Sequence, residues 1–178
     1  MLRGESPVAT EIRELAEVPG ADWQALFAGN ADPFEIEPLN LSWRPKDTHF
    51  VLYSDGRAAS HVSILLRHMV RAGSSAVRVT GVAGVVTRPD LRRRGLARRL
   101  LGHALRETQS RTGSAFALLF CLPKLVPLYK GLGWQEISSV VHVEQPCGVI
   151  EAPLRTMVLP LRGEKWPAGP VWLDSPPW

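Results

Sequence analysis

A short basic loop carries the residues of this chain whose types and spacing point most directly to chemistry. It contains the pattern Arg92-x-x-Gly95-x-Ala97. Gly95 can adopt backbone conformations closed to other residues, and Ala97 keeps side-chain bulk away from a ligand near the backbone. Leucine and alanine recur at helical spacing over residues 96–105, so the loop should lead into a helix. The free amides and the positive dipole end of that helix would bind an anion such as a pyrophosphate.

The apolar, β-branched segment before the loop predicts a buried strand over residues 76–87, broken by Gly81 and Gly84. Strand, loop and helix together predict a site for a CoA-type donor, and so acyl transfer. Six arginines lie between Arg88 and Arg99, which suggests one anionic ligand rather than a polyanion. The alternative is a helix N-terminus with a solvated basic face. The residues expected to bind the donor are Val85, Val86, Thr87, Arg92, Arg93, Arg94, Gly95, Leu96, Ala97 and Arg98.

Tyr129 is the candidate catalytic residue. Acyl transfer from a thioester to an amine needs a donor for the developing oxyanion and a proton for the departing thiolate. A phenol with a pKa of about 10 could protonate a thiolate whose conjugate acid has a pKa of about 8.5. A free backbone N–H near Val86 and Thr87 could polarise the thioester carbonyl. The alternative for Tyr129 is a half-buried core tyrosine.

Several other residues are candidates for the amine-binding side of the site. His61 could face the acceptor cleft or act as a base near neutral pH, although most lone strand histidines are structural or solvated. Glu35 and Glu37 could collect a cationic acceptor, and a solvated loop is the alternative for both. Ala83 and Phe120, on the two strands beside the donor, are expected to bind the acceptor as well.

The composition is that of one small globular domain. Of 178 residues, 45% are hydrophobic and 21% charged, and the net charge is +4, with no recognisable nucleic-acid-binding module. No stretch is long enough to cross a membrane, and Met1–Pro7 lacks the apolar core of a signal peptide. Cys121 and Cys147 are too few for a disulfide framework, which favours the cytoplasm, and Cys121 is expected to be a small core residue. The histidines show no metal-ligand spacing, so no metal is expected.

Hydrophobic patterning predicts an α+β chain. Strands are expected over residues 11–16, 49–53, 59–70, 76–87 and 115–121, with a helical turn as the alternative for the first of these. Helices are expected after Asp22 as N-cap, after Gly95, and over 126–132. The Asp55-Gly56 pair suits a hairpin turn. Strands 76–87 and 115–121 should be parallel neighbours, splayed by a bulge at one of the two glycines so that a pantetheine arm fits between them. Residues 140–144 and 154–161 are expected to form a closing hairpin.

At Val85–Leu105, Ala115–Cys121 and Leu128–Trp134 the chain resembles the GCN5-related N-acetyltransferase (GNAT) superfamily. The last segment is similar to that family's aromatic, Tyr, Gly and aromatic signature. The resemblance implies the GNAT fold, a mixed and mostly antiparallel central sheet with a parallel, splayed strand pair, flanked by helices. It also implies an N-acetyltransferase that moves an acetyl group from acetyl-CoA to a primary amine of a small molecule, by direct attack in a ternary complex.

Residues 59–61, 158–161 and 166–169 are similar to two branches of that superfamily, the aminoglycoside 2'-N-acetyltransferases and the rhizobial nodulation N-acyltransferases. The aminoglycoside branch has a glutamate as its base where this chain has Ala83, and its drug-binding acid falls near residues 153–154. The chain therefore keeps the donor site and lacks much of that branch's acceptor chemistry. Two other interpretations remain open: a CoA-binding sensor or partner module of low activity, and an acyltransferase that takes a longer acyl group from acyl carrier protein.

Residues 1–162 are expected to form the acyltransferase domain, and residues 163–178 a Trp/Pro-rich tail packed on it near the acceptor cleft. Trp166, Trp172 and Trp178 carry too much apolar area for a disordered end, and the prolines lower the entropy lost on docking. The alternatives are an exposed low-complexity tail, or an apolar patch that pairs two subunits into a homodimer.

Overall fold

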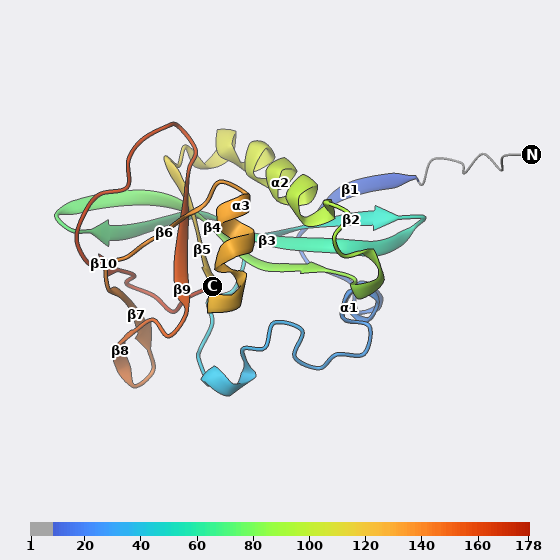
Figure 1. Ribbon diagram of the computed structural model, residues 1–178, viewed down its shortest axis with the longest axis horizontal. Coiled ribbons are helices and arrows are strands. Elements are labelled where there is room, and N and C mark those ends of the chain that lie inside the picture. Colours follow the sequence, from blue (N-terminus) through green and yellow to red (C-terminus); the bar gives the residue numbers. More distant parts are fainter. Residues whose placement is uncertain (1–8) are drawn as a thin grey trace, which may run out of the picture.

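A computed structural model describes residues 9–178 (Figure 1), so Met1–Pro7 lies outside the described residues. The strands are β1 (Thr10–Leu15), β2 (Thr48–Ser54), β3 (Arg57–Ala72), β4 (Ser75–Thr87), β5 (Phe116–Cys121), β6 (Gln135–Glu136), β7 (Val141–Gln145), β8 (Gly148–Glu151), β9 (Arg155–Pro160) and β10 (Val171–Trp172). The helices are α1 (Gly20–Phe27), α2 (Leu96–Thr112) and α3 (Val126–Gly131), with 3-10 turns at Glu37–Leu39, Pro89–Leu91 and Pro123–Leu125. Within the described chain the strands form one mixed sheet in the order β6-β9-β5-β4-β3-β10-β7-β8, and β2 and β1 extend it from β3.

Alternating side chains divide the sheet into two covered faces. Phe50 and Leu52 of β2 pack with the apolar side of α2, and Val51 and Tyr53 between them pack with α1 on the other face. Helix α3 shares the α2 side through Tyr129. In Figure 1, α2 runs along the top of the sheet and α1 lies at the lower right. The α+β fold class and the mixed sheet with flanking helices are confirmed.

The parallel neighbours β4 and β5 separate at one end. They pair only from Val79 to Val82 against Phe116 to Leu119. Beyond that point the register of β4 against β3 shifts by one residue at Gly84, whose φ of +57° is readily adopted only by glycine. The last part of β4 therefore keeps its pairing with β3 and leaves the β5 side unpaired, as the sequence predicts.

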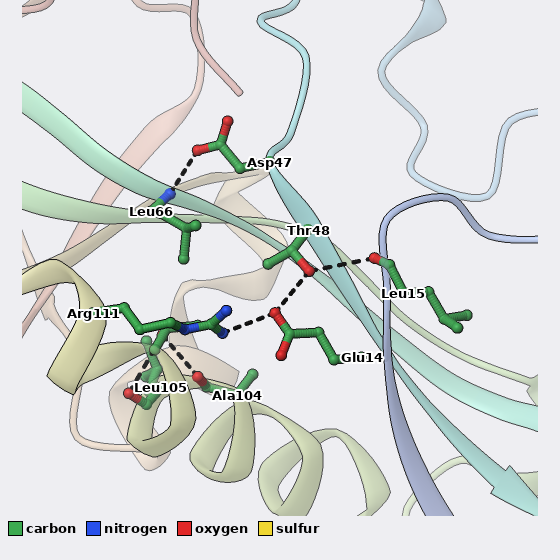
Figure 2. Close-up of polar contacts among 9 residues, drawn as sticks. Glu14, Leu15, Asp47, Thr48, Leu66, Ala104, Leu105 and Arg111 are labelled. Carbon is green, nitrogen blue, oxygen red and sulfur yellow. Dashed lines mark hydrogen bonds and ion pairs between the residues drawn. The ribbon is translucent and has the colours of Figure 1, made fainter.

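The start of β2 is held in place by polar contacts (Figure 2). The Asp47 carboxylate accepts a hydrogen bond from the Leu66 amide at 2.8 Å, at the second register shift between β3 and β4. The Thr48 hydroxyl donates to Glu14 at 3.0 Å, and Glu14 forms a 2.8 Å ion pair with Arg111 near the end of α2. Strands β1 and β2 are thus tied to α2 and to β3 just before the residues that enter the site.

Two sequence predictions are wrong. Asp22 is not the N-cap of α1, because Pro19 precedes the helix and the Asp22 carboxylate instead accepts the Tyr53 hydroxyl at 2.6 Å. The closing hairpin from 140–144 and 154–161 does not form. A short turn pairs β7 with β8, and β9 lies between β5 and β6. Apolar alternation marks a strand but does not specify its partner.

The C-terminal segment contributes to the sheet. Strand β10 lies between β3, to which it is antiparallel, and β7, to which it is parallel. Val171, Leu173 and Trp178 are each at most 3% exposed. The Trp178 indole N–H donates to the Leu118 carbonyl at 3.1 Å. None of the helices in residues 9–178 is long and apolar enough to cross a membrane.

Candidate active site

The loop from β4 to α2 presents a row of free backbone amides. Gly95 precedes the helix with a φ of +75°, and Arg93 also has a positive φ of +63°. Among the described residues, the amides from Arg93 to Arg98 donate to no protein acceptor, since the first helical hydrogen bond runs from Arg99 to Gly95. A Cβ added at Gly95 would meet no atom within 4 Å, so the space above the loop is open. These are the features of an anion site at a helix N-terminus.

The arginines around this loop fall into two groups according to the groups that they contact. Arg92 donates to the Thr87 carbonyl at 3.2 Å, and Arg98 donates to the Gly131 carbonyl at 3.0 Å, which joins the start of α2 to the end of α3. Arg88 pairs with Asp90 at 2.7 Å. Arg99 donates to Thr10 at 2.9 Å. The first two therefore frame the loop, and the last two stabilise its surroundings.

A cavity of about 990 Å³ extends from the loop along the open part of β4 to the segment before β2. It brings together fourteen of the predicted site residues: Glu35, His61, Ala83, Val85, Val86, Thr87, Arg92, Arg93, Gly95, Leu96, Ala97, Arg98, Phe120 and Tyr129. Two predicted residues, Arg94 and Glu37, are exposed and do not line it. Donor loop, splayed strands and acceptor candidates thus meet in one continuous space.

The unpaired edge of β4 offers a backbone donor to this cavity. The Arg88 amide donates to the Ala59 carbonyl of β3 at 2.9 Å. Because amides alternate along a strand, the Thr87 amide points away from β3, toward the side that β5 has left. The Thr87 side chain lies against β3, with its hydroxyl 2.9 Å from that of Ser60.

Tyr129 lines the cavity from α3 and is 5% exposed. Its ring packs edge-on against Trp134, at 6.0 Å between centroids. Burial raises the pKa of Tyr129 well above its ordinary value, so the phenol is neutral at physiological pH. Burial also raises the pKa of the Cys121 thiol to about 11, so this thiol stays protonated at physiological pH.

His61 is 1% exposed, and both of its ring nitrogens have partners. Nδ1 lies 2.6 Å from the Gly84 carbonyl oxygen, and Nε2 lies 3.0 Å from Nδ1 of His49. Burial lowers the pKa of His61 to about 3. His61 is therefore a neutral residue with no free nitrogen for an acceptor.

The acceptor end of the cavity also contains residues that sequence reasoning missed, namely Trp23, Phe34, Trp43, Lys46 and His49. A cluster of aromatic residues near a predicted cleft was the signal available for the first three. Trp178, from the tail that was expected near the acceptor cleft, lines the cavity as well. Glu35, the only acidic side chain among the lining residues, forms an ion pair with Lys124. The site therefore leaves no unpaired carboxylate to attract a cation, whereas Lys46 and three arginines line it.

A fold with a splayed parallel strand pair and a free-amide loop before a helix defines the class of acyltransferases that use a nucleotide-linked donor. A model of the Acetyltransferase (GNAT) domain matches residues 21–137. This chain belongs to the GNAT acetyltransferase family. No curated protein matches the sequence significantly.

Solved structures share the fold at low sequence identity. The Escherichia coli GNAT family N-acetyltransferase YhbS, in complex with CoA, is 17% identical with a TM-score of 0.60, over 97% of this chain and 94% of that chain. The Escherichia coli ribosomal-protein-S18-alanine N-acetyltransferase is 19% identical with a TM-score of 0.56, over 88% and 97%. FeeM, an N-acyl amino acid synthase from uncultured soil microbes, is 14% identical with a TM-score of 0.56, over 88% and 93%. At these identities the similarity shows a shared fold and no more.

Proposed function

We propose that this protein is an N-acetyltransferase that transfers the acetyl group of acetyl-CoA to a primary amine of a small molecule by direct attack in a ternary complex. The observation that carries the proposal is the single cavity, which joins the free-amide loop, the open edge of β4 and a separate aromatic end. A donor and an acceptor can thus occupy opposite ends and meet between β4 and β5. Direct transfer needs no covalent enzyme intermediate, and the raised pKa of Cys121 disfavours the thiolate that such an intermediate would need.

On the donor side, the amides from Arg93 to Arg98 would hold the pyrophosphate, with Arg92 and Arg98 beside them. The pantetheine arm would extend along the unpaired edge of β4. The Thr87 amide would then donate to the thioester carbonyl as negative charge develops there. One such donor is worth about 3–4 kcal/mol of barrier.

On the acceptor side, the lining favours a small amine with an apolar body over a polycationic aminoglycoside. Trp23, Phe34 and Trp43 supply aromatic walls, and Lys46 adds positive charge. The acidic positions that the aminoglycoside resemblance implies fall at Ala83 and near residues 153–154, and both Ala83 and Leu154 are apolar residues that line the cavity. This lining therefore supports an acceptor other than an aminoglycoside.

Turnover of acetyl-CoA, followed by thiol release, tests the function. The amine panel contains phenylethylamine, a lysine-containing peptide and an aminoglycoside. We expect acetylation of phenylethylamine at a higher kcat/KM than of the aminoglycoside. Octanoyl-CoA and acyl-carrier-protein donors run in parallel determine whether a longer acyl group is preferred. Tight acetyl-CoA binding without turnover of any amine would instead identify a CoA-binding module.

Replacing Tyr129 by phenylalanine should lower kcat about 10- to 100-fold and leave acetyl-CoA affinity nearly unchanged. Its pKa is too high for complete proton transfer to a thiolate, so we propose that the neutral phenol donates a hydrogen bond to the departing sulfur. A hydrogen bond to a charged group is worth about 1.5–3 kcal/mol. Tyr53→Phe is the matched control, because that hydroxyl donates to Asp22 outside the cavity. Unchanged turnover of Tyr129→Phe, with chemistry rate-limiting, would remove Tyr129 from the mechanism.

The environment of the cysteines supports a reducing compartment such as the cytoplasm. Cys121 is buried and Cys147 is exposed, and neither forms a disulfide. An exposed free thiol persists where thiols are kept reduced.

A further inference from the structure

Two histidines connect the bulge of β4 to the acceptor end of the cavity. The Gly84 carbonyl oxygen can only accept a hydrogen bond, so the 2.6 Å contact requires the proton of His61 on Nδ1. Nε2 of neutral His61 is then an acceptor, and its 3.0 Å contact requires the proton of neutral His49 on Nδ1. The lone pair of His49 is left on Nε2. The chain of contacts thus determines the tautomers of both rings.

Packing and hydrogen bonds surround the two histidines. His61 packs edge-on against Trp23, at 4.5 Å between ring centroids. A Cβ at Gly84 would lie 3.1 Å from the His61 ring, so glycine lets the ring reach the bulge. The two residues before His49 are anchored to β1 and β3 by the contacts of Asp47 and Thr48 (Figure 2). His49 itself is half-buried and lines the cavity.

We propose that Nε2 of His49 is the general base that accepts the proton of the acceptor amine, and that His61 is the positioning residue that fixes the His49 tautomer. The inference rests on the proposed N-acetyltransferase function and deepens it by naming the general base. Ala83 has no carboxylate that could accept the proton of the amine. Both histidines, Gly84 and Thr87 line the same cavity.

Acetyl transfer would then proceed through a tetrahedral adduct. The lone pair of the neutral amine attacks the thioester carbon, a C–N bond forms, and the carbonyl π electrons move to oxygen near the Thr87 amide. The nitrogen, now positively charged, loses its proton to Nε2 of His49. Collapse of the adduct breaks the C–S bond, and the thiolate leaves with a hydrogen bond from Tyr129. His49 returns its proton through solvent to the thiolate, which gives the amide and the free thiol.

The charges around His49 favour its base form. Burial is the largest cause that lowers the pKa of His49, and the charge of Lys46, just before β2, lowers it further. Glu17, between β1 and α1, acts in the opposite direction, and His61 across the strand pair is neutral. The pKa of His49 is therefore below its usual value of about 6.5. A lowered pKa keeps the base unprotonated at pH 7, so kcat, measured with both substrates saturating, should rise with pH through a pKa below 6.5 and then level off. The kcat/KM profile carries the ionisation of the free amine in addition.

The test compares His49→Gln with the parent protein, using phenylethylamine and acetyl-CoA. We expect a loss of about 100-fold in kcat, within the range of general base catalysis, with unchanged acetyl-CoA affinity. The acidic limb of the pH profile should disappear. His61→Gln should retain that limb with a shifted pKa and a reduced kcat. His103→Gln, on α2 and absent from the cavity lining, is the matched control and should match the parent.

A spectroscopic readout accompanies the kinetics. Long-range ¹H–¹⁵N spectra of the unliganded parent protein should show His61 as the neutral Nδ1–H tautomer from pH 5 to 8, and His49 titrating below pH 6.5. An Nε2–H tautomer of His61, or an unchanged acidic limb in His49→Gln, would overturn the inference while amine acetylation by the parent still stands. Acetyl-CoA binding without acetylation of any amine by the parent would instead refute the proposed function, and the base with it.

Discussion

Gly95→Asp is expected to abolish acetyl-CoA binding in a protein that still folds. The new side chain would project into the open space at Gly95, in the middle of the segment whose amides, from Arg93 to Arg98, are free. Aspartate tolerates a positive φ better than most residues, and a carboxylate at a helix N-terminus is stabilising. The substitution therefore costs the fold little. It places a negative charge and bulk where the pyrophosphate would bind, so we expect at least a 100-fold loss of affinity.

Calorimetric titration with acetyl-CoA measures this loss, and thermal unfolding without ligand verifies the fold. Gly56→Asp is the matched control. Gly56 has nearly the same φ, +73°, and equally open space, but it lies in the β2–β3 turn outside the cavity. It should bind acetyl-CoA like the parent. If acetyl-CoA stabilises Gly95→Asp against heat as much as it stabilises the parent, the donor site lies elsewhere.

Deleting the residues after Arg162 should unfold much of the protein. The deletion removes β10 from the sheet, together with buried Val171, Leu173 and Trp178. Burial of each such side chain is worth about 1.5–3 kcal/mol, and small domains have only about 5–15 kcal/mol of stability. Circular dichroism and denaturant unfolding measure the effect. A truncated protein that melts at the parent's temperature would show that this segment is dispensable.

A milder variant separates stability from selectivity. Trp178→Ala should cost about 3–5 kcal/mol, and change the relative kcat/KM for different amines, with little change in acetyl-CoA affinity. The indole lines the cavity and packs edge-on against Phe120, at 5.4 Å between centroids. Trp172→Ala is the matched control, because Trp172 stacks on His142 and does not line the cavity. An unchanged amine profile in Trp178→Ala would confine that residue to a structural role.

The donor loop was predictable because its geometry is local. A glycine before a run of leucines at helical spacing is enough to indicate a helix that starts at a positive-φ residue, and Gly95 has that conformation. The splay of β4 from β5 was predictable for a related reason, since only a residue such as Gly84 permits the bulge without strain.

The histidine pair was not predictable, because it depends on a one-residue register shift. The Asp55-Gly56 turn alone would place His49 opposite Val62, with His61 on the other face of the sheet. The structure shifts the β2–β3 register between Leu52 and Tyr53, so His49 lies opposite Ser63 and shares a face with His61. No residue type in this hairpin signals the shift. The partners of β7 and β9 were beyond prediction for the same reason, since pairing depends on distant parts of the chain.

Strand β10 has a consequence for how the protein is made. The β7–β8 hairpin connects to the remainder of the sheet through β10. It can therefore take its place in the sheet only after residues 171–172 have left the ribosome. Until then the end of β3 is an unpaired edge, open to pairing with another nascent chain. Such distant pairings raise the contact order, and chains of high contact order fold slowly. Translation that stalls before residue 171 should therefore produce aggregation-prone fragments.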